Sequence, residues 1–81
     1  MNDVEIIERV KKVISEVLGV DTDKIRLEDR FVEDLGAESV QSLELVAAFE
    51  EEFGIEMDEE KALEVKTVAK AVDFIKEYLK K

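Results

Sequence analysis

Apolar residues near the start of the chain recur at intervals of three and four positions, the period of an amphipathic helix. Asn2 or Asp3 can cap such a helix at its start, and Gly19 stands where a left-handed residue commonly ends one. We therefore predict a first helix over residues 4–18. Its apolar positions are Val4, Ile6, Ile7, Val10, Val13, Ile14, Val17 and Leu18.

Residues 20–35 have no sustained period, which predicts a long loop, and a loop of this length in a small domain is often functional. Asp21 and Asp23 resemble the start of a calcium-binding loop, but Arg26 takes the required glycine position and Val32 the required glutamate position. We therefore expect no calcium site here. The apolar residues expected to anchor the loop to the core are Ile25, Leu27, Phe31, Val32 and Leu35.

Residues 39–53, between Gly36 and Gly54, are predicted to form a second long helix with two different apolar faces. The face expected in the core carries Ser42, Leu45, Val46, Phe49 and Phe53. The opposite face carries Val40, Leu43 and Ala47 among Glu44, Glu50 and Glu51. An aligned apolar strip bordered by acids on the solvent side of a helix indicates a docking surface. The alternative is that a neighbouring loop covers the strip.

The last third of the chain predicts a short helix and a longer one. Asp58, Glu59 and Glu60 suit the first turn of a short helix that reaches about residue 65. Thr67 can cap a final helix that runs to Leu79. Its core stripe is Val68, Ala71, Val72, Ile75 and Leu79, and its last turn holds Lys76, Lys80 and Lys81. The sum is an all-α, four-helix bundle of one domain over residues 1–81, with a short third helix and a long loop between the first two.

The charge of the chain limits its partners. Lys and Arg number 12 against 22 Asp and Glu, so the formal net charge is −10. Such a surface repels nucleic-acid phosphates and anionic lipids, and it favours proteins with basic patches. The alternative is that the charge serves only solubility.

Cysteine and histidine are both absent from the sequence, which excludes disulfides, the common zinc and copper sites, and Ser-His or Cys-His catalysis. Paired acids could act as general acid and base, but 22 acidic residues make such pairs unavoidable. We therefore expect no metal site, no catalytic residue and no enzymatic activity. The N-terminus does not resemble a signal peptide, and no apolar run reaches membrane-spanning length. A cytoplasmic monomer without membrane insertion is expected.

Ser39 is the candidate site on physical grounds, because it lies at the start of the second helix beside the exposed apolar strip. Serine at a helix start is usually a cap. A helix N-terminus also stabilises an attached phosphate through its free amides and its dipole, so Ser39 could instead carry a phosphodiester. Both interpretations stay open at this point.

Several blocks of the sequence, at correct mutual spacing, resemble the acyl carrier protein family. The run Phe31-Val32-Glu33-Asp34-Leu35-Gly36-Ala37-Glu38-Ser39-Val40 resembles the family signature, which centres on Asp-Ser-Leu. Residues 42–46 and 49–55 are similar to the rest of the family's recognition helix, and residues 67–75 to its final helix. The resemblance covers nearly the whole chain without evident gaps.

The resemblance implies that Ser39 accepts 4'-phosphopantetheine from coenzyme A through a phosphopantetheinyl transferase. The terminal thiol of the arm would hold acyl groups as thioesters, in fatty-acid biosynthesis or a related specialised acyl pathway. Acyl chains of family members can fold back between the helices. Partner enzymes of acyl-chain synthesis or transfer would dock basic patches on the second helix. By position, that surface is Glu38, Val40, Leu43, Glu44, Ala47, Glu50 and Glu51.

The sequence departs from the family pattern at five positions. Glu38 replaces the usual Asp before the serine, Val40 the usual Leu after it, and Gln41 a common acid. Ala47 stands at a position often held by methionine, and Asp58 at one often held by proline, where it should alter only the start of the third helix. These departures leave open a carrier separate from housekeeping fatty-acid synthesis. They also leave open an unmodified acidic helical adaptor that binds partner proteins through the second helix.

Overall fold

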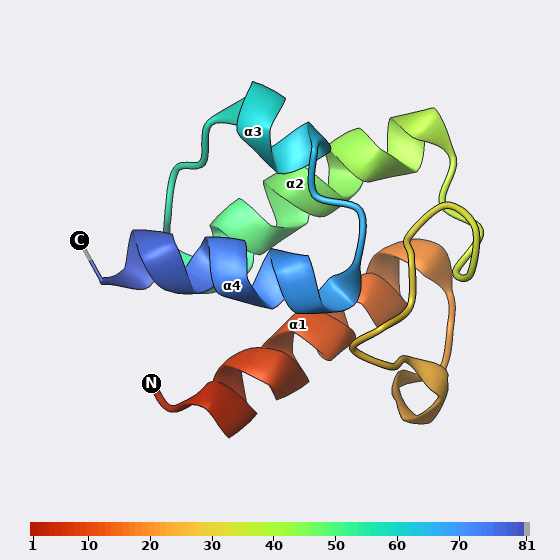
Figure 1. Cartoon of the computed structure of the whole chain (residues 1–81), viewed down its shortest axis with the longest axis horizontal. Coiled ribbons are helices and arrows are strands. Elements are labelled where there is room, and N and C mark those ends of the chain that lie inside the picture. The colour runs from red at the N-terminus through yellow and green to blue at the C-terminus, as the bar shows by residue number, and fades with distance from the viewer. Residues whose placement is uncertain (81) are drawn as a thin grey trace.

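The computed structural model describes residues 1–80, and this part of the chain forms four α-helices and one 3-10 turn (Figure 1). The elements in chain order are α1 (Asp3–Leu18), η1 (Thr22–Lys24), α2 (Ser39–Phe53), α3 (Glu59–Leu63) and α4 (Val68–Leu79). Helix α1 packs against both α2 and α4, and α2 also contacts α3. The predicted all-α bundle with a short third helix is therefore confirmed. The expected position of Lys81 in the last turn lies outside the described residues.

Helix α2 has the predicted extent, α1 begins one residue earlier than predicted, and both helices carry strong end signals. The Asn2 side chain accepts a hydrogen bond from the amide of Glu5 at 2.8 Å. With Asn2 as the N-cap, α1 begins at Asp3, one residue before the first apolar position, Val4. Gly19 and Gly54 follow the two helices in the left-handed conformation, with φ of 72° and 64°. This conformation carries little strain in glycine and ends a helix in a well-defined way.

The predicted core face of α2 is confirmed. Leu45, Phe49 and Phe53 are buried, and Ser42 and Val46 are half-buried beside them. They belong to one apolar cluster that draws on α1, α2, α4 and the loops, and no polar side chain is buried in the described residues. The buried members are Ile6, Val10, Val13, Ile14, Ile25, Phe31, Ala37, Leu45, Phe49, Phe53, Met57, Val68, Ala71, Val72 and Ile75.

Helix α3 is shorter than predicted and ends at Leu63 instead of residue 65. The amides of Glu64 and Val65 bond to carbonyls three residues back, at 3.2 and 3.1 Å, so the chain leaves the α-helix through a tighter turn. Asp58 is the N-cap, and its side chain accepts from the amide of Lys61 at 3.2 Å. Helix α4 starts as predicted, with Thr67 Oγ1 accepting from the amide of Lys70 at 3.2 Å.

The long loop is held differently from the prediction. Ile25 and Phe31 are buried and Leu35 is half-buried, but Leu27 and Val32 are exposed and do not anchor the loop. Backbone hydrogen bonds to the start of α4 do this instead. The donors and acceptors are Phe31 N to Lys66 O at 3.0 Å, Val68 N to Asp29 O at 3.0 Å, and Ala69 N to Leu27 O at 2.8 Å.

Arg9 of α1 clamps the C-terminal end of α2. Its Nε donates to Glu52 Oε2 at 2.7 Å and its guanidinium also donates to the Glu52 carbonyl at 2.6 Å. The same guanidinium lies 5.1 Å from the centre of the Phe53 ring, a cation–π distance. The hydrogen bond from Arg9, assisted by the charge of Lys12, lowers the pKa of Glu52 below its ordinary value of 4.5.

Truncation of the α2 core face should destabilise the fold. We expect Leu45→Ala or Phe49→Ala to lower the free energy of unfolding by roughly 2–5 kcal/mol, because each opens a cavity in a thin core. Urea denaturation measures the change. Val40→Ala on the exposed face is the control and should stay within about 0.5 kcal/mol of the native protein. Equal losses in all three variants would contradict the assignment of the two faces.

Loss of the Glu52 carboxylate should reduce the acid sensitivity of the fold. The pKa of Glu52 is lower in the folded than in the unfolded chain, so its contribution is fully present above the unfolded value and disappears as the pH falls through the folded value. We expect Glu52→Gln to be less stable than the native protein at pH 7, and the gap to close in acid below pH 4.5. Urea denaturation across this range tests it. Glu56→Gln, at an exposed position, is the control; a gap that persists unchanged in acid would contradict the prediction.

Candidate functional site

Ser39 is the first residue of α2 and is exposed, and among the described residues its hydroxyl forms no hydrogen bond. The interpretation of Ser39 as a cap is wrong, since the N-cap is Glu38 with φ of −89° and ψ of 165°. The Glu38 amide donates to Gln41 Oε1 at 2.9 Å, which is one half of a capping box. The start of α2 is thus capped without the serine hydroxyl.

A tight turn between Phe31 and Ala37 leads into α2. Phe31 and Ala37 are both buried, and the amide of Ala37 donates to the carbonyl of Phe31 at 2.8 Å. Between them Gly36 adopts φ of 73°, a left-handed conformation that favours glycine. Arg30 donates from its backbone amide to Asp34 at 2.7 Å and from its side chain at 3.1 Å, and these bonds lower the pKa of the Asp34 carboxyl.

The first turn of α2 can accommodate a phosphate on Ser39. The first hydrogen bond of the helix runs from Ser42 N to Glu38 O at 3.0 Å, so the amides of Ser39 and Val40 precede the hydrogen-bonded ladder. These amides and the helix dipole make the N-terminus favourable for an anion. No acidic residue lies within the first turn itself, although Glu38 immediately precedes it. The local chemistry therefore fits a phosphodiester on an exposed hydroxyl.

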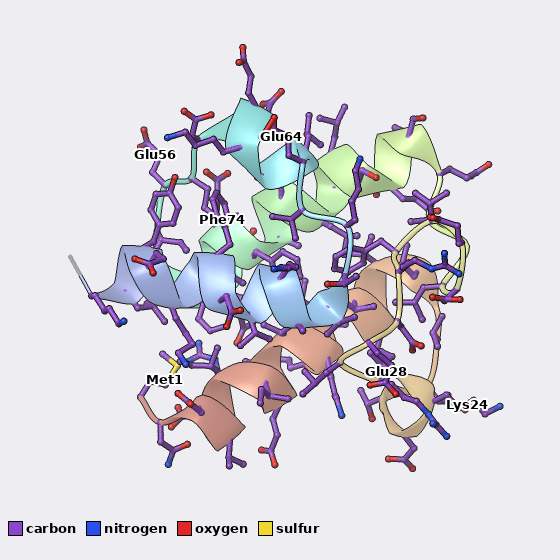
Figure 2. All side chains as sticks on the ribbon, viewed as in Figure 1. Met1, Lys24, Glu28, Glu56, Glu64 and Phe74 are labelled. Atoms are coloured by element: carbon purple, nitrogen blue, oxygen red, sulfur yellow. The ribbon has the colours of Figure 1, made fainter. Side chains whose placement is uncertain are left out.

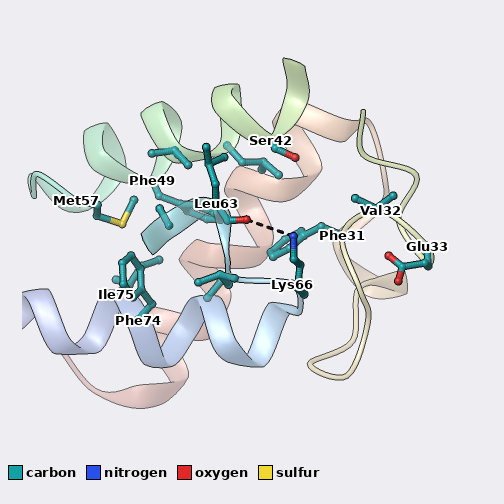
Figure 3. Close-up of a pocket in the computed structure, with 15 residues that line it drawn as sticks. Phe31, Val32, Glu33, Ser42, Phe49, Met57, Leu63, Lys66, Phe74 and Ile75 are labelled. Atoms are coloured by element: carbon teal, nitrogen blue, oxygen red, sulfur yellow. Dashed lines mark hydrogen bonds between the residues drawn. The ribbon is translucent and has the colours of Figure 1, made fainter. Parts of the chain in front are cut away.

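An apolar cavity of about 70 Å³ lies among α2, α3, α4 and the turn before α2 (Figure 3). One end of its lining includes Val32, Glu33, Ser42 and Lys66, and Ser42 is one helical turn after Ser39. The other end includes Met57, Phe74 and Ile75 and is apolar. The volume is below the roughly 150 Å³ of a cavity that binds benzene, so the walls must move before a longer alkyl chain can enter.

The predicted docking strip is open to solvent. The exposed fractions of Val40 and Leu43 are 61% and 46%, and Ala47 is also exposed, so the alternative that a loop covers the strip is wrong. Glu38, Glu44 and Glu51 around the strip are exposed as well.

Glu50 differs from the other residues of the predicted docking surface. It is half-buried, and its Oε2 accepts a hydrogen bond from the amide of Met57 at 2.8 Å. Asp58 has a similar second contact: besides capping α3, it donates its amide to Tyr78 Oη at 3.0 Å, which proline could not do. Helical periodicity gave no signal for either contact, because both join residues of different elements.

Residues 1–80, which the structure describes, contain neither a cluster of metal ligands nor a membrane-spanning helix. No group of three or more His, Cys, Asp or Glu side chains is arranged to hold a metal ion. No helix in this part of the chain is long and apolar enough to cross a membrane.

The helices and the exposed serine belong to a small helical domain, and comparison with known proteins identifies its class. A family model described as a phosphopantetheine attachment site matches residues 8–75. The chain is 48% identical over 75 residues to an acyl carrier protein of Thermosynechococcus vestitus, and the match covers 93% of each chain. The chain therefore belongs to the acyl carrier protein family. Its function is to carry acyl intermediates, and its cofactor is covalently attached 4'-phosphopantetheine.

Proposed function

We propose that Ser39 is the residue that carries the phosphopantetheine arm. The observation that supports this most directly is an exposed serine hydroxyl, not used as a cap, at the N-terminus of α2 and one turn from the cavity. The Ser39 oxygen would form the new phosphodiester while the phosphoanhydride of coenzyme A breaks and the nucleotide half leaves. The hydroxyl proton would pass to a base of the phosphopantetheinyl transferase.

The residues around the arm would then protect the cargo. When bound, the arm supplies a terminal thiol that holds an acyl group as a thioester. The apolar lining of Leu45, Phe49 and Ile75 offers an alkyl chain a surface shielded from water, at roughly 0.8 kcal/mol for each buried methylene. The chain itself would catalyse no step of this transfer.

The charge distribution supports docking of basic partners at α2 and α3. Residues 33–64 contain 12 acidic residues and only one basic residue, Lys61, for a net charge of −11, and the remaining residues sum to +1. Glu56 and Glu64, labelled in Figure 2, precede and follow α3 and are both exposed. This half of the molecule would attract a transferase and acyl-chain synthesis or transfer enzymes with basic patches.

The setting we propose is fatty-acid biosynthesis or a related specialised acyl pathway, in the cytoplasm. The alternative of an unmodified adaptor rested on the changed residues around Ser39. Glu38 and Gln41 have a structural role at the start of α2, so their departure from the family pattern does not argue against modification.

Intact mass spectrometry tests the attachment residue. After incubation with coenzyme A and a broad-specificity phosphopantetheinyl transferase, we expect the native protein to gain one phosphopantetheinyl group and Ser39→Ala to gain none. Ser42→Ala is the matched control, since it removes the next serine of α2 and should still be modified. No gain in the native protein with several transferases would contradict the proposal, as would modification of Ser39→Ala.

Charge reversal on α2 tests the docking surface. We expect Glu44→Lys with Glu51→Lys to raise the KM of the transferase at least several-fold, because both side chains are exposed and part of the attractive field is lost. The free energy of unfolding should change by no more than about 0.5 kcal/mol. Glu8→Lys with Glu16→Lys, at two exposed positions of α1, makes the same change of net charge and controls for charge alone. A similar KM for both variants would argue against docking on α2.

A further inference from the structure

Lys66 supplies the positive charge in the lining of the cavity. Of the 15 described residues that line it, two are charged, Glu33 and Lys66 (Figure 3). Both lie at the end that also includes Val32 and Ser42, and Ser42 is one helical turn after Ser39. We call this end the mouth. The cavity therefore combines a polar, charged mouth with an apolar interior.

The ammonium group of Lys66 forms no ion pair with any residue of the described range 1–80. Its Nζ donates to the carbonyl of Leu63 at 3.5 Å, longer than the usual range for such a bond, and Figure 3 shows the side chain directed toward that carbonyl. The acids of the turn before α2 are already paired, because Arg30 lies 3.6 Å from Glu33 and 3.1 Å from Asp34. Lys66 is thus available to an anion from outside the chain.

The backbone holds Lys66 at the mouth independently of its side chain. The Lys66 carbonyl accepts from the amide of Phe31 at 3.0 Å, and Phe31 is buried in the core. The next residue, Thr67, is the N-cap of α4. The Lys66 side chain itself is exposed. Its replacement should therefore change the charge of the mouth without moving the loop or the helix.

The two ends of the cavity suit acyl groups of different chemistry. An alkyl group is favoured at the apolar end, where Phe49, Phe74 and Ile75 shield it from water. A carboxylate is excluded from that end, because an unpaired charge is strongly disfavoured among apolar side chains. At the mouth it can form a charge-assisted hydrogen bond with the Lys66 ammonium. Residues 33–64 hold 12 acidic residues against one basic residue, so a carboxylate on the arm is repelled by most of the surrounding surface.

We propose that Lys66 is a specificity-determining residue that holds carboxylated acyl groups at the mouth of the cavity. The substrate class is the short dicarboxylic acyl group, joined to the arm as a thioester through one carboxyl and ionised at the other. The ion pair is exposed and therefore weak and screened by salt, so the group stays accessible to an enzyme. An uncharged alkyl group passes Lys66 and enters the apolar end. This inference rests on the proposed function, because it requires the arm on Ser39.

NMR spectra of the protein loaded with two thioesters of the same shape test this inference. The probes are the succinyl group and the 4-methylpentanoyl group, which differ in that a carboxylate replaces an isopropyl end. Relative to the unloaded arm, we expect the succinyl group to shift the amide resonances of Val32 and Lys66 at the mouth. The 4-methylpentanoyl group should instead shift those of Met57 and Phe74 at the apolar end.

Variants of Lys66 separate its charge from its structural position. In Lys66→Gln we expect the succinyl-induced shift at Val32 to fall by about half or more, because the ion pair is lost, while the shifts induced by 4-methylpentanoyl stay unchanged. Lys66→Arg should restore the succinyl-induced shift. Lys61→Gln is the matched control, since it removes an exposed charge of α3 outside the cavity lining and should behave as the native protein does.

A second measurement follows the ammonium group itself. Reductive methylation of the lysines, read by mass spectrometry of peptides, should be about twofold slower at Lys66 in the succinyl-loaded than in the 4-methylpentanoyl-loaded protein, because a paired ammonium is less reactive. Lys61 is the internal reference and should react equally in both.

The inference is overturned if both thioesters shift the same resonances in the native protein. It is equally overturned if Lys66→Gln keeps the succinyl-induced shift at Val32 in full, or if Lys66 is methylated at the same rate with either cargo. Intact mass, measured before the NMR spectra, distinguishes these results from a failure of the proposed function. A native protein that accepts neither thioester would contradict the role of Ser39, and this inference with it.

Discussion

The structure depends on how the first amides of α4 find acceptors. An α-helix leaves its initial amides without partners, and here the carbonyls of Asp29 and Leu27 accept from Val68 and Ala69, while Lys66 accepts from Phe31. These bonds satisfy the helix end and fix the long loop at once. The bond from Phe31 to Lys66 also fixes the position of the turn between Phe31 and Ala37, which determines where α2 begins. The position of Ser39 thus follows from hydrogen bonds of backbone amides far from it in the sequence.

The distribution of the buried side chains explains how a carrier of this size can bind an acyl chain and remain folded. The fully buried side chains come largely from α1 and α4, and the Arg9–Glu52 clamp joins α1 to α2 at the end away from Ser39. Helix α3 contributes no buried residue, so displacing it uncovers the cavity lining but leaves the main packing of α1 against its neighbours intact. The helices that provide most of the buried core are therefore not those whose residues form the α3 wall of the cavity.

Sequence periodicity and end signals predicted what depends on local chemistry. The extent of α2, its two faces and the caps at Asn2 and Thr67 follow from side chains within a turn of one another. The exposure of Leu27 and Val32 could not be predicted, because the loop is held by backbone bonds that any residue can make. The contact of Glu50 with Met57 and the cavity depend on how separate helices pack, which a linear pattern does not contain.

The cap of α2 gives the departures around Ser39 a physical meaning. Glu38, and not Ser39, is the N-cap of α2, so the start of the helix does not depend on the serine hydroxyl. The family's usual aspartate is among the best N-caps, and glutamate is a poorer one. Gln41 offsets this difference, because its side-chain oxygen accepts from the amide of Glu38 and satisfies a further donor at the helix end. The changes at residues 38 and 41 therefore belong together: they keep the start of α2 ordered while Ser39 stays exposed.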